Sequence, residues 1–116
     1  MNGTIYKVMS RGALAEAKAH GSFEGSADDR RDGFIHLSSA NQLEATLAKH
    51  FAGKKDLVLL AVDSGILGER LQWEASRGGD LFPHLYGPLD LKALVWDEPL
   101  ELGADGRHRL PSRVLP

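Results

Sequence analysis

The pattern of apolar and polar positions near the start of the chain predicts a strand followed by a helix. Segment 4–9 is rich in β-forming residues, which favours an extended conformation. Ser10 has the side chain of a helix N-cap, and the run after it ends at Gly21, a residue favoured at helix C-termini. One face of this predicted helix carries Ala13, Leu14 and Ala17.

The next part of the chain combines a polar stretch with a second helix. Segment 21–33 is dense in glycine, serine and aspartate and has no apolar periodicity, so we expect an exposed loop there. A short strand is expected over 33–37. Ser39 and Gln42 then have the spacing of a capping box, which predicts a helix that ends near Phe51.

The clearest strand is the continuous apolar run DLVLLAV at 56–62, which is typical of a strand covered on both faces. A second strand is expected over 70–75, where Leu71 and Trp73 alternate with polar residues. We therefore expect Leu71 and Trp73 to face the interior and the polar residues between them to face water.

Shorter extended segments at 82–86 and 92–96, and a turn-rich tail from Pro99 that predicts a hairpin, complete the pattern. Strands and helices do not alternate regularly, which favours the α+β class. We predict a mixed, mainly antiparallel sheet with two N-terminal helices. The length of 116 residues is that of a single domain, spanning 1–116.

The composition excludes several classes of site. The chain has no cysteine, which excludes a disulfide scaffold, a thiolate metal site and a cysteine nucleophile. Its formal net charge of −2 lacks the basic excess of most nucleic-acid binders, so we expect no double-stranded nucleic acid as a partner. Neither a secretory-signal pattern nor a membrane-spanning apolar stretch is found, and we expect a cytoplasmic protein without a membrane partner.

Two groups of residues could carry chemistry. The first is His36 with Ser38 and Ser39, where a predicted strand ends and a helix begins. The free N–H groups of a helix N-terminus attract phosphate or carboxylate, and the hydroxyl groups and the imidazole add hydrogen bonds. In the alternative interpretation, Ser39 only caps the helix and His36 only packs.

The second group is Trp73, Glu74, Arg77, His84 and Tyr86. An aromatic ring stacks on a base or a nicotinamide, an arginine pairs with phosphate, and a glutamate or histidine transfers protons or holds a ribose hydroxyl. Alternatively, Glu74 and Arg77 only pair with each other at the surface, and the aromatic residues fill the core.

If the two groups form one site, His36 and His84 must lie together. We expect Glu74 to turn into the cleft at the end of its strand, with Trp73 as a wall or in the core, and desolvation to raise the pKa of Glu74. Arg77 should lie at the mouth of the cleft with no carboxylate fully occupying its guanidinium.

A metal-dependent hydrolase is a further alternative, because His36, His84 and Glu74 are ligand types found in catalytic zinc and iron sites. No HExxH motif supports it, and we expect no metal site. The nucleophile elbow G-x-S-x-G, the GxGxxG fingerprint and the Walker motif are also missing from the sequence.

Four strings, DGFIHLS, LVLLAVD, LQWEASRGG and LFPHLYGPL, occur in this order. Together they resemble an uncharacterised bacterial family, domain of unknown function 952, whose members carry GFIH, then WE, then FPH followed by YGPL. The resemblance extends from Ile5 to about Pro111. It implies an ADP-ribosyltransferase-like fold.

In the ADP-ribosyltransferase superfamily, a strand of the form G-x-x-[Tyr or His] followed by Ser stacks on nicotinamide. The segment 33–38 is similar to this element, and the resemblance places His36 at the stacking position. The first-strand position, where a histidine would hold the adenosine ribose, is Lys7. The third position, which often holds a catalytic glutamate, falls at 84–86, where no glutamate stands; Glu74 precedes it.

The residues and the resemblance together predict a cleft for NAD or a related phosphorylated ribonucleotide, with NAD as ligand or substrate. We assign proton transfer to His36, Glu74 and His84. The predicted ligand-binding residues are Lys7, Ser38, Ser39, Trp73, Arg77 and Tyr86. The alternative function is a non-catalytic module that senses such a ligand or binds a protein.

Overall fold

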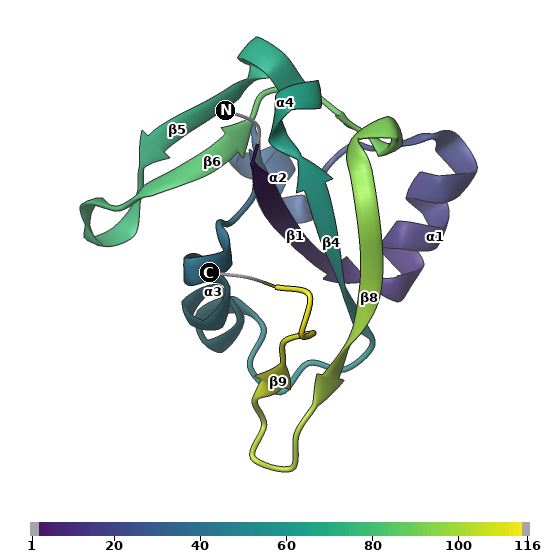
Figure 1. The fold of residues 1–116 in the computed structure, drawn as a ribbon, viewed down its shortest axis with the longest axis vertical. Helices are drawn as coiled ribbons and strands as arrows, with labels where there is room; N and C mark the ends of the chain where they lie inside the picture. Colours follow the sequence, from purple (N-terminus) through teal and green to yellow (C-terminus); the bar gives the residue numbers. More distant parts are fainter. Residues whose placement is uncertain (1–2, 115–116) are drawn as a thin grey trace.

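The computed structural model describes residues 3–114, except for the side chain of Arg77. Its centre is a four-stranded antiparallel sheet in the order β1–β4–β8–β9 (Figure 1). The strands of this central sheet are β1 (Thr4–Ser10), β4 (Leu57–Asp63), β8 (Leu94–Leu102) and β9 (His108–Arg109).

Two smaller sheets flank the central one. A three-stranded sheet has the order β3–β6–β5, and β2 pairs with β7. Their strands are β2 (Ser22–Phe23), β3 (Ile35–His36), β5 (Leu71–Ala75), β6 (Leu81–Leu85) and β7 (Leu89–Asp90). A pair of backbone hydrogen bonds between Tyr6 and Ser38, of 2.8 and 2.9 Å, joins β1 to the chain just after β3. The polypeptide therefore curls from the central sheet into the β3–β6–β5 sheet.

Helical segments cover the sheets. The α-helices are α1 (Arg11–His20), α2 (Ala27–Asp32), α3 (Leu43–His50) and α4 (Ser64–Leu67). The 3₁₀ turns are η1 (Ala40–Gln42), η2 (Gly68–Arg70), η3 (Arg77–Gly79) and η4 (Leu91–Ala93). Within the described residues, none of the helices has the length and apolar character needed to cross a membrane.

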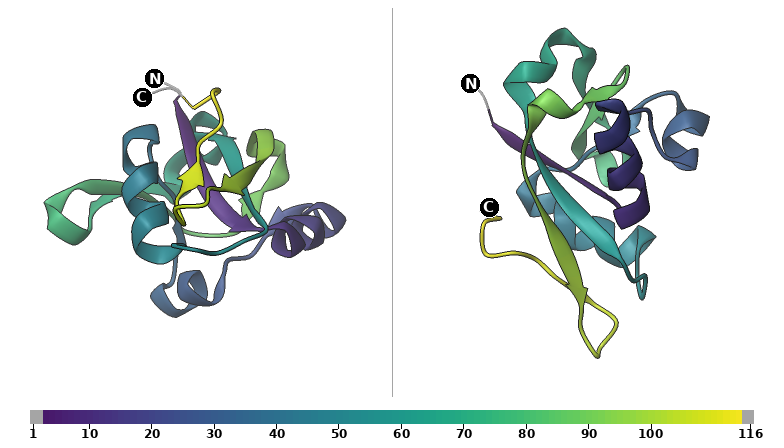
Figure 2. Two further views of the ribbon diagram at one scale, coloured as in Figure 1. Left: turned by 90° about the horizontal axis from the view of Figure 1, so that it is seen from below. Right: turned by 90° about the vertical axis from the view of Figure 1, so that its right-hand side faces the viewer.

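Strand β4 is buried on both faces, which confirms the prediction from its continuous apolar run. Leu60 packs in one apolar cluster with Leu14 of α1. Its neighbour Leu59 points to the other face and packs with Leu43 of α3. Helices α1 and α3 accordingly lie on opposite sides of the central strands (Figure 2). The core is thus two apolar layers separated by one sheet.

Helix α1 begins and ends where the sequence predicts. The hydroxyl oxygen of Ser10 accepts a hydrogen bond of 3.1 Å from the backbone N–H of Ala13, as an N-cap does. At the other end Gly21 has a φ of 85°, in the left-handed region, and its N–H donates to the carbonyl of Ala17. Leu14 and Ala17 are buried, as the predicted apolar face requires.

The prediction of an exposed loop over 21–33 is right about the exposure of most of these residues but wrong about the loop. This stretch contains β2 and α2, and α2 begins with a capping box between Ser26 and Asp29. Six residues are too few to show a helical repeat of apolar positions. The helix is held by its cap and by hydrogen bonds of Asp29 to distant residues, which no local pattern reveals.

Other predictions are confirmed only in part. The fold is α+β with a curled sheet, but each strand pair described in residues 3–114 is antiparallel, so the sheet is not mixed. The described residues contain four α-helices, where two were expected. The helix expected over 39–51 starts as the turn η1 before α3, and the strand expected at 92–96 is the longer β8, which forms the predicted C-terminal hairpin with β9.

The cap of α2 has a measurable effect on stability. We expect Ser26→Ala to lower the free energy of unfolding by about 1 kcal/mol, because the N–H of Asp29 loses its hydroxyl acceptor. Chemical denaturation of the variant and the wild type measures this difference. Ser112→Ala, in an exposed turn, is the control and should change nothing. Equal stability of all three proteins would show that the cap is unimportant.

Candidate functional site

The pairing of β3 with β6 brings together the two histidines that the sequence singled out. In this antiparallel ladder His36 lies directly opposite His84, and their ring centroids are 5.9 Å apart. The prediction that His36 and His84 come together is confirmed. Both rings line a cleft of about 450 Å³, which we call the histidine cleft. This volume is in the usual range for a small-molecule site.

The histidine cleft is walled by elements that are far apart in sequence. Side chains of α2, β1 and β6 meet there with Thr46 and Lys49 of α3. Phe34 supplies an aromatic surface, because its ring is stacked on the ring of His84 with centroids 3.9 Å apart and contacts His36 at 4.6 Å. The cleft therefore combines a flat apolar surface with titratable groups, which suits a ligand that has both a ring and polar substituents.

His36 is fixed by side chains on both sides of its backbone. Its N–H donates to Asp29 Oδ1 at 3.1 Å, and its carbonyl accepts from Lys7 Nζ at 2.9 Å. Its ring nitrogen Nδ1 lies 2.6 Å from the same Asp29 oxygen. Strand β3 has only two residues, Ile35 and His36. The side-chain hydrogen bonds to His36 therefore fix its position as further backbone hydrogen bonds would in a longer strand. The ring orientation of His36 is thus set by Asp29.

Asp29 and Lys7 form a buried ion pair at the base of the cleft. Lys7 Nζ lies 3.0 and 3.2 Å from the two carboxylate oxygens, and both side chains are less than a tenth exposed. Burial alone would raise the pKa of Asp29, but the hydrogen bond from His36 and the charge of Lys7 hold it well below the usual range. Burial lowers the pKa of Lys7, and Asp29 opposes that change.

A second carboxylate contacts the outer nitrogen of His36. Asp32 Oδ2 lies 2.9 Å from His36 Nε2, so each ring nitrogen faces a carboxylate. Hydrogen bonding and charge from Arg31 keep the pKa of Asp32 low, so this group accepts hydrogen bonds and donates none. Carboxylates accept and do not donate, so a hydrogen bond at both ring nitrogens requires that both carry a proton.

His84 is held differently. Its Nδ1 lies 2.8 Å from Glu74 Oε1, which also accepts a 2.7 Å hydrogen bond from the hydroxyl of Tyr86. The hydrogen bonds from Tyr86 and His84 lower the pKa of Glu74, so the prediction of a raised value is wrong. The reason is that the Glu74 side chain is 41% exposed, so desolvation raises its pKa less than these hydrogen bonds lower it. As a carboxylate Glu74 accepts and does not donate, so Nδ1 of His84 is the donor in this bond.

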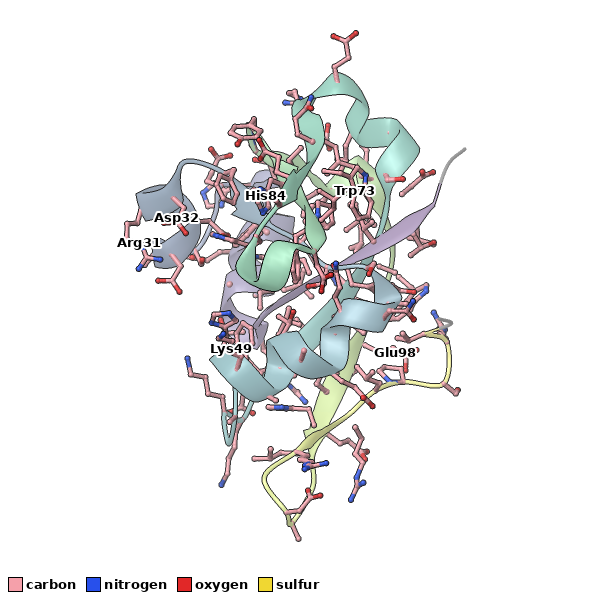
Figure 3. All side chains as sticks on the ribbon, turned by 90° about the vertical axis from the view of Figure 1, so that its left-hand side faces the viewer. Arg31, Asp32, Lys49, Trp73, His84 and Glu98 are labelled. Atoms are coloured by element: carbon pink, nitrogen blue, oxygen red, sulfur yellow. The ribbon has the colours of Figure 1, made fainter. Side chains whose placement is uncertain are left out.

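The expected position of Trp73 is also wrong. Trp73 is 47% exposed, and it lies opposite Pro83 in the β5–β6 hairpin, on the face away from the cleft. In Figure 3 it lies beyond His84, on the side away from Arg31 and Asp32. Glu74 lies on the face of Phe82 and reaches His84, as expected, although its carboxylate contacts that histidine and does not line the cleft. Alternation along β5 is therefore regular, but the polar side faces the site.

The remaining predicted ligand-binding residues are dispersed. Ser38 is buried in the cleft wall, with its hydroxyl 3.2 Å from that of Thr46. The N–H of Ser39 donates to the side chain of Gln42, so this helix start has one donor less for an anion. Tyr86 is exposed and acts on His84 through Glu74. The prediction for Arg77 concerns a side chain outside the described part of the chain.

Sequence reasoning missed several residues of the cleft. These are Asp29, Arg31, Asp32, Phe34, Thr46 and Lys49. A usable signal was present for one of them, because Ser26 and Asp29 have capping-box spacing and would have predicted a helix before His36. The set His36, His84 and Glu74 does not form a metal site: over residues 3–114, leaving the Arg77 side chain aside, no three such groups are placed to hold an ion.

Comparisons with known proteins agree with this fold. Solved structures of protein CC0527 from Caulobacter crescentus are similar to the chain. The crystal structure is 53% identical over 92% of this chain and 94% of that chain, with a TM-score of 0.89. A crystal structure of its double mutant is 52% identical with the same coverage and TM-score. The solution NMR structure is 55% identical over 90% of each chain, with a TM-score of 0.81.

A search of curated proteins found no match. A family model described as a protein of unknown function, DUF952, matches residues 8–97. The matched region contains both histidine–carboxylate pairs of the site, His36 with Asp29 and His84 with Glu74. Since the model matches most of the sequence, the chain belongs to the DUF952 family of proteins of unknown function.

Proposed function

We propose that the histidine cleft is an ADP-ribosyltransferase-like site that binds NAD or a related phosphorylated ribonucleotide, with His36 and His84 as its acid–base groups. The observation that carries the proposal is the pairing of the two imidazoles, 5.9 Å apart, each with its Nδ1 bound to a carboxylate. Two titratable groups with different surroundings in one cleft are a common basis for acid–base chemistry.

The two histidines have different roles in this proposal. Each ring nitrogen of His36 faces a carboxylate, so with both nitrogens protonated this ring is the group that donates to a phosphate of the ligand. His84 keeps its Nδ1 proton on Glu74, so its Nε2 accepts a proton. The aromatic surface of Phe34 beside both rings supports binding of a planar base or a nicotinamide.

With NAD as substrate, the reaction is hydrolysis at the nicotinamide ribose. A water oxygen bonds to C1′ while the bond from C1′ to the nicotinamide nitrogen breaks, and its electron pair leaves with the nicotinamide. His84 Nε2 takes the proton of the water, and ADP-ribose and nicotinamide are the products. A positioned general base contributes about 10²- to 10⁴-fold to such a step.

A thermal-shift screen tests binding. NAD, ADP-ribose and cyclic or 2′-phosphorylated nucleotides are compared, because a ligand at 100 times its dissociation constant stabilises by about 2.7 kcal/mol and raises the melting temperature by several degrees. We expect at least one of them to do so. A flat response across the whole set would contradict the proposal.

Release of nicotinamide from NAD by the purified protein tests turnover. Ligand binding without any release would instead identify a non-catalytic module that senses the nucleotide, which is the alternative function. Comparison of the wild type with a His84 variant shows whether a measured release comes from this cleft.

Glu74 gives a prediction that separates function from folding. We expect Glu74→Gln to remove turnover or weaken ligand binding, because the neutral amide no longer fixes the proton of His84 on Nδ1. The melting temperature should stay nearly unchanged, since the side chain is 41% exposed. Tyr86→Phe removes the other bond to Glu74 and is the matched comparison, with a smaller effect expected. A Glu74→Gln protein that binds and turns over ligand like the wild type would remove Glu74 from the site.

A further inference from the structure

We propose that Arg31 and His36 form the subsite for a phosphate group of the ligand, and that the carboxylate of Asp32 occupies this subsite when no ligand is bound. The inference deepens the proposed function and rests on it for the identity of the whole ligand. It starts from the outer end of the histidine cleft, where all three side chains line the wall.

The contacts of Asp32 are those that a phosphate would make. Its Oδ1 accepts from Arg31 Nε at 3.0 Å, and its Oδ2 lies 3.4 Å from Arg31 Nη2 and 2.9 Å from His36 Nε2. A guanidinium fork and an imidazolium aimed at one anionic group are a recurring arrangement for phosphate recognition. The structure thus directs the guanidinium of Arg31 and the Nε2 atom of His36 at one point, and the carboxylate of Asp32 lies there.

The position of Asp32 on its helix supports this interpretation. It is the last residue of α2, where the exposed carbonyl groups disfavour a negative charge. The side chain is only one-third exposed, because it is drawn toward the cleft and away from water. Helix stability therefore does not explain an aspartate at this position, whereas closure of an anion subsite does.

Asp28, on the same helix as Asp32, is the control residue for a test of this subsite. It also pairs with Arg31, at 3.2 Å, and it also lines the cleft, but its side chain is 69% exposed and no contact with His36 is described. Figure 3 shows Arg31 and Asp32 next to each other on α2, on the side of the molecule that carries His84. A ligand phosphate must displace Asp32 to reach both Arg31 and His36, whereas Asp28 can keep its contact with Arg31.

Competition between the Asp32 carboxylate and a phosphate lowers the apparent affinity of the subsite for the phosphate. If Asp32 occupies the subsite in about nine of ten molecules, the apparent dissociation constant for an anion is about tenfold higher than that of the open subsite. Removing the charge of Asp32 lifts this competition. The same change at Asp28 alters the net charge equally and leaves the competition in place.

Titration with inorganic phosphate, followed by NMR of the imidazole signals, tests the subsite. We expect Asp32→Asn to bind phosphate about tenfold more tightly than the wild type, with the signals of His36 shifting, and Asp28→Asn to differ by less than about twofold. Arg31→Gln should lose phosphate binding. Unchanged or weaker binding by Asp32→Asn, or an equal gain in Asp28→Asn, would overturn the inference. Circular dichroism confirms that each variant is folded.

A parallel titration with ADP-ribose separates this inference from the proposed function. If phosphate responds as expected but none of the variants binds ADP-ribose, the anion subsite stands and the nucleotide proposal falls. If ADP-ribose binds and shifts the signals of His84 while Asp32→Asn leaves both affinities unchanged, the nucleotide proposal stands and the subsite inference is overturned.

Discussion

Replacing Asp29 by asparagine should lower the free energy of unfolding by about 3–5 kcal/mol, the cost of breaking a buried ion pair by removing one partner. The two Asp29 oxygens accept from Lys7, from the His36 ring and from the N–H groups of Ser26 and His36. Asparagine offers one acceptor oxygen, and its NH₂ group would face donors. Lys7 would then be buried without a charged partner.

Chemical denaturation measures this loss. The control is Asp97→Asn, which removes the same charge from a pair with Lys18 whose side chains are 30% and 54% exposed. Exposed pairs contribute about 0–1 kcal/mol, so the control should stay close to the wild type. Equal losses in the two variants would mean that Asp29 is not the centre of the buried cluster.

The same residue predicts an acid dependence of stability. The pKa of Asp29 in the folded protein is below its value in the unfolded chain, so the unfolded state binds more protons and stability falls as the pH decreases. The contribution is fully present above the unfolded value and is lost progressively below about pH 5. Melting temperatures between pH 7 and pH 3 should therefore fall less in Asp29→Asn than in the wild type. Parallel curves would contradict the assignment.

The largest functional effect is expected from His84. We expect His84→Gln to slow nicotinamide release from NAD by about 10²- to 10⁴-fold, because the cleft loses its general base. The glutamine fills a similar volume and keeps a donor toward Glu74, so the fold should survive. His108→Gln is the control, since His108 bonds to the carbonyl of Lys54 and does not line the cleft. A rate within twofold of the wild type would exclude His84 as the base.

The sequence predicts those parts of the fold whose signals are local. Helix α1 has both its caps within its own segment, and β4 has an apolar run that is buried in full. The capping box of α2 is a local signal, but the six residues of this helix show no apolar repeat. The contacts of Asp29 with Lys7 and His36, which also hold the helix, come from other elements. A local pattern contains no information on such long-range bonds.

The site residues divide in the same way, into those with a local sequence signal and those placed by contacts between distant segments. The sequence predicts that His36 and His84 lie together, because both occur in short strings of polar and aromatic residues, and the pairing of β3 with β6 confirms it. Alternation placed Leu71 and Trp73 on one face of β5 and predicted that this face is buried, but it could not say how far along the strand the burial extends. Leu71 packs on the core at the base of the β5–β6 hairpin, but the hairpin projects from the central sheet (Figure 1) and Trp73 is 47% exposed. The polar face with Glu74 meets the cleft.

The central claim is that the two histidines together bind a phosphorylated ribonucleotide. Titration of the protein with ADP-ribose, monitored through the imidazole ¹⁵N and ¹H signals, tests it most directly, because each histidine reports separately. We predict that the signals of His36 and His84 shift with one common dissociation constant and that those of His20 and His108 do not, since neither lines the histidine cleft. Binding that leaves both cleft histidines unchanged, or the lack of any binding, would contradict the claim.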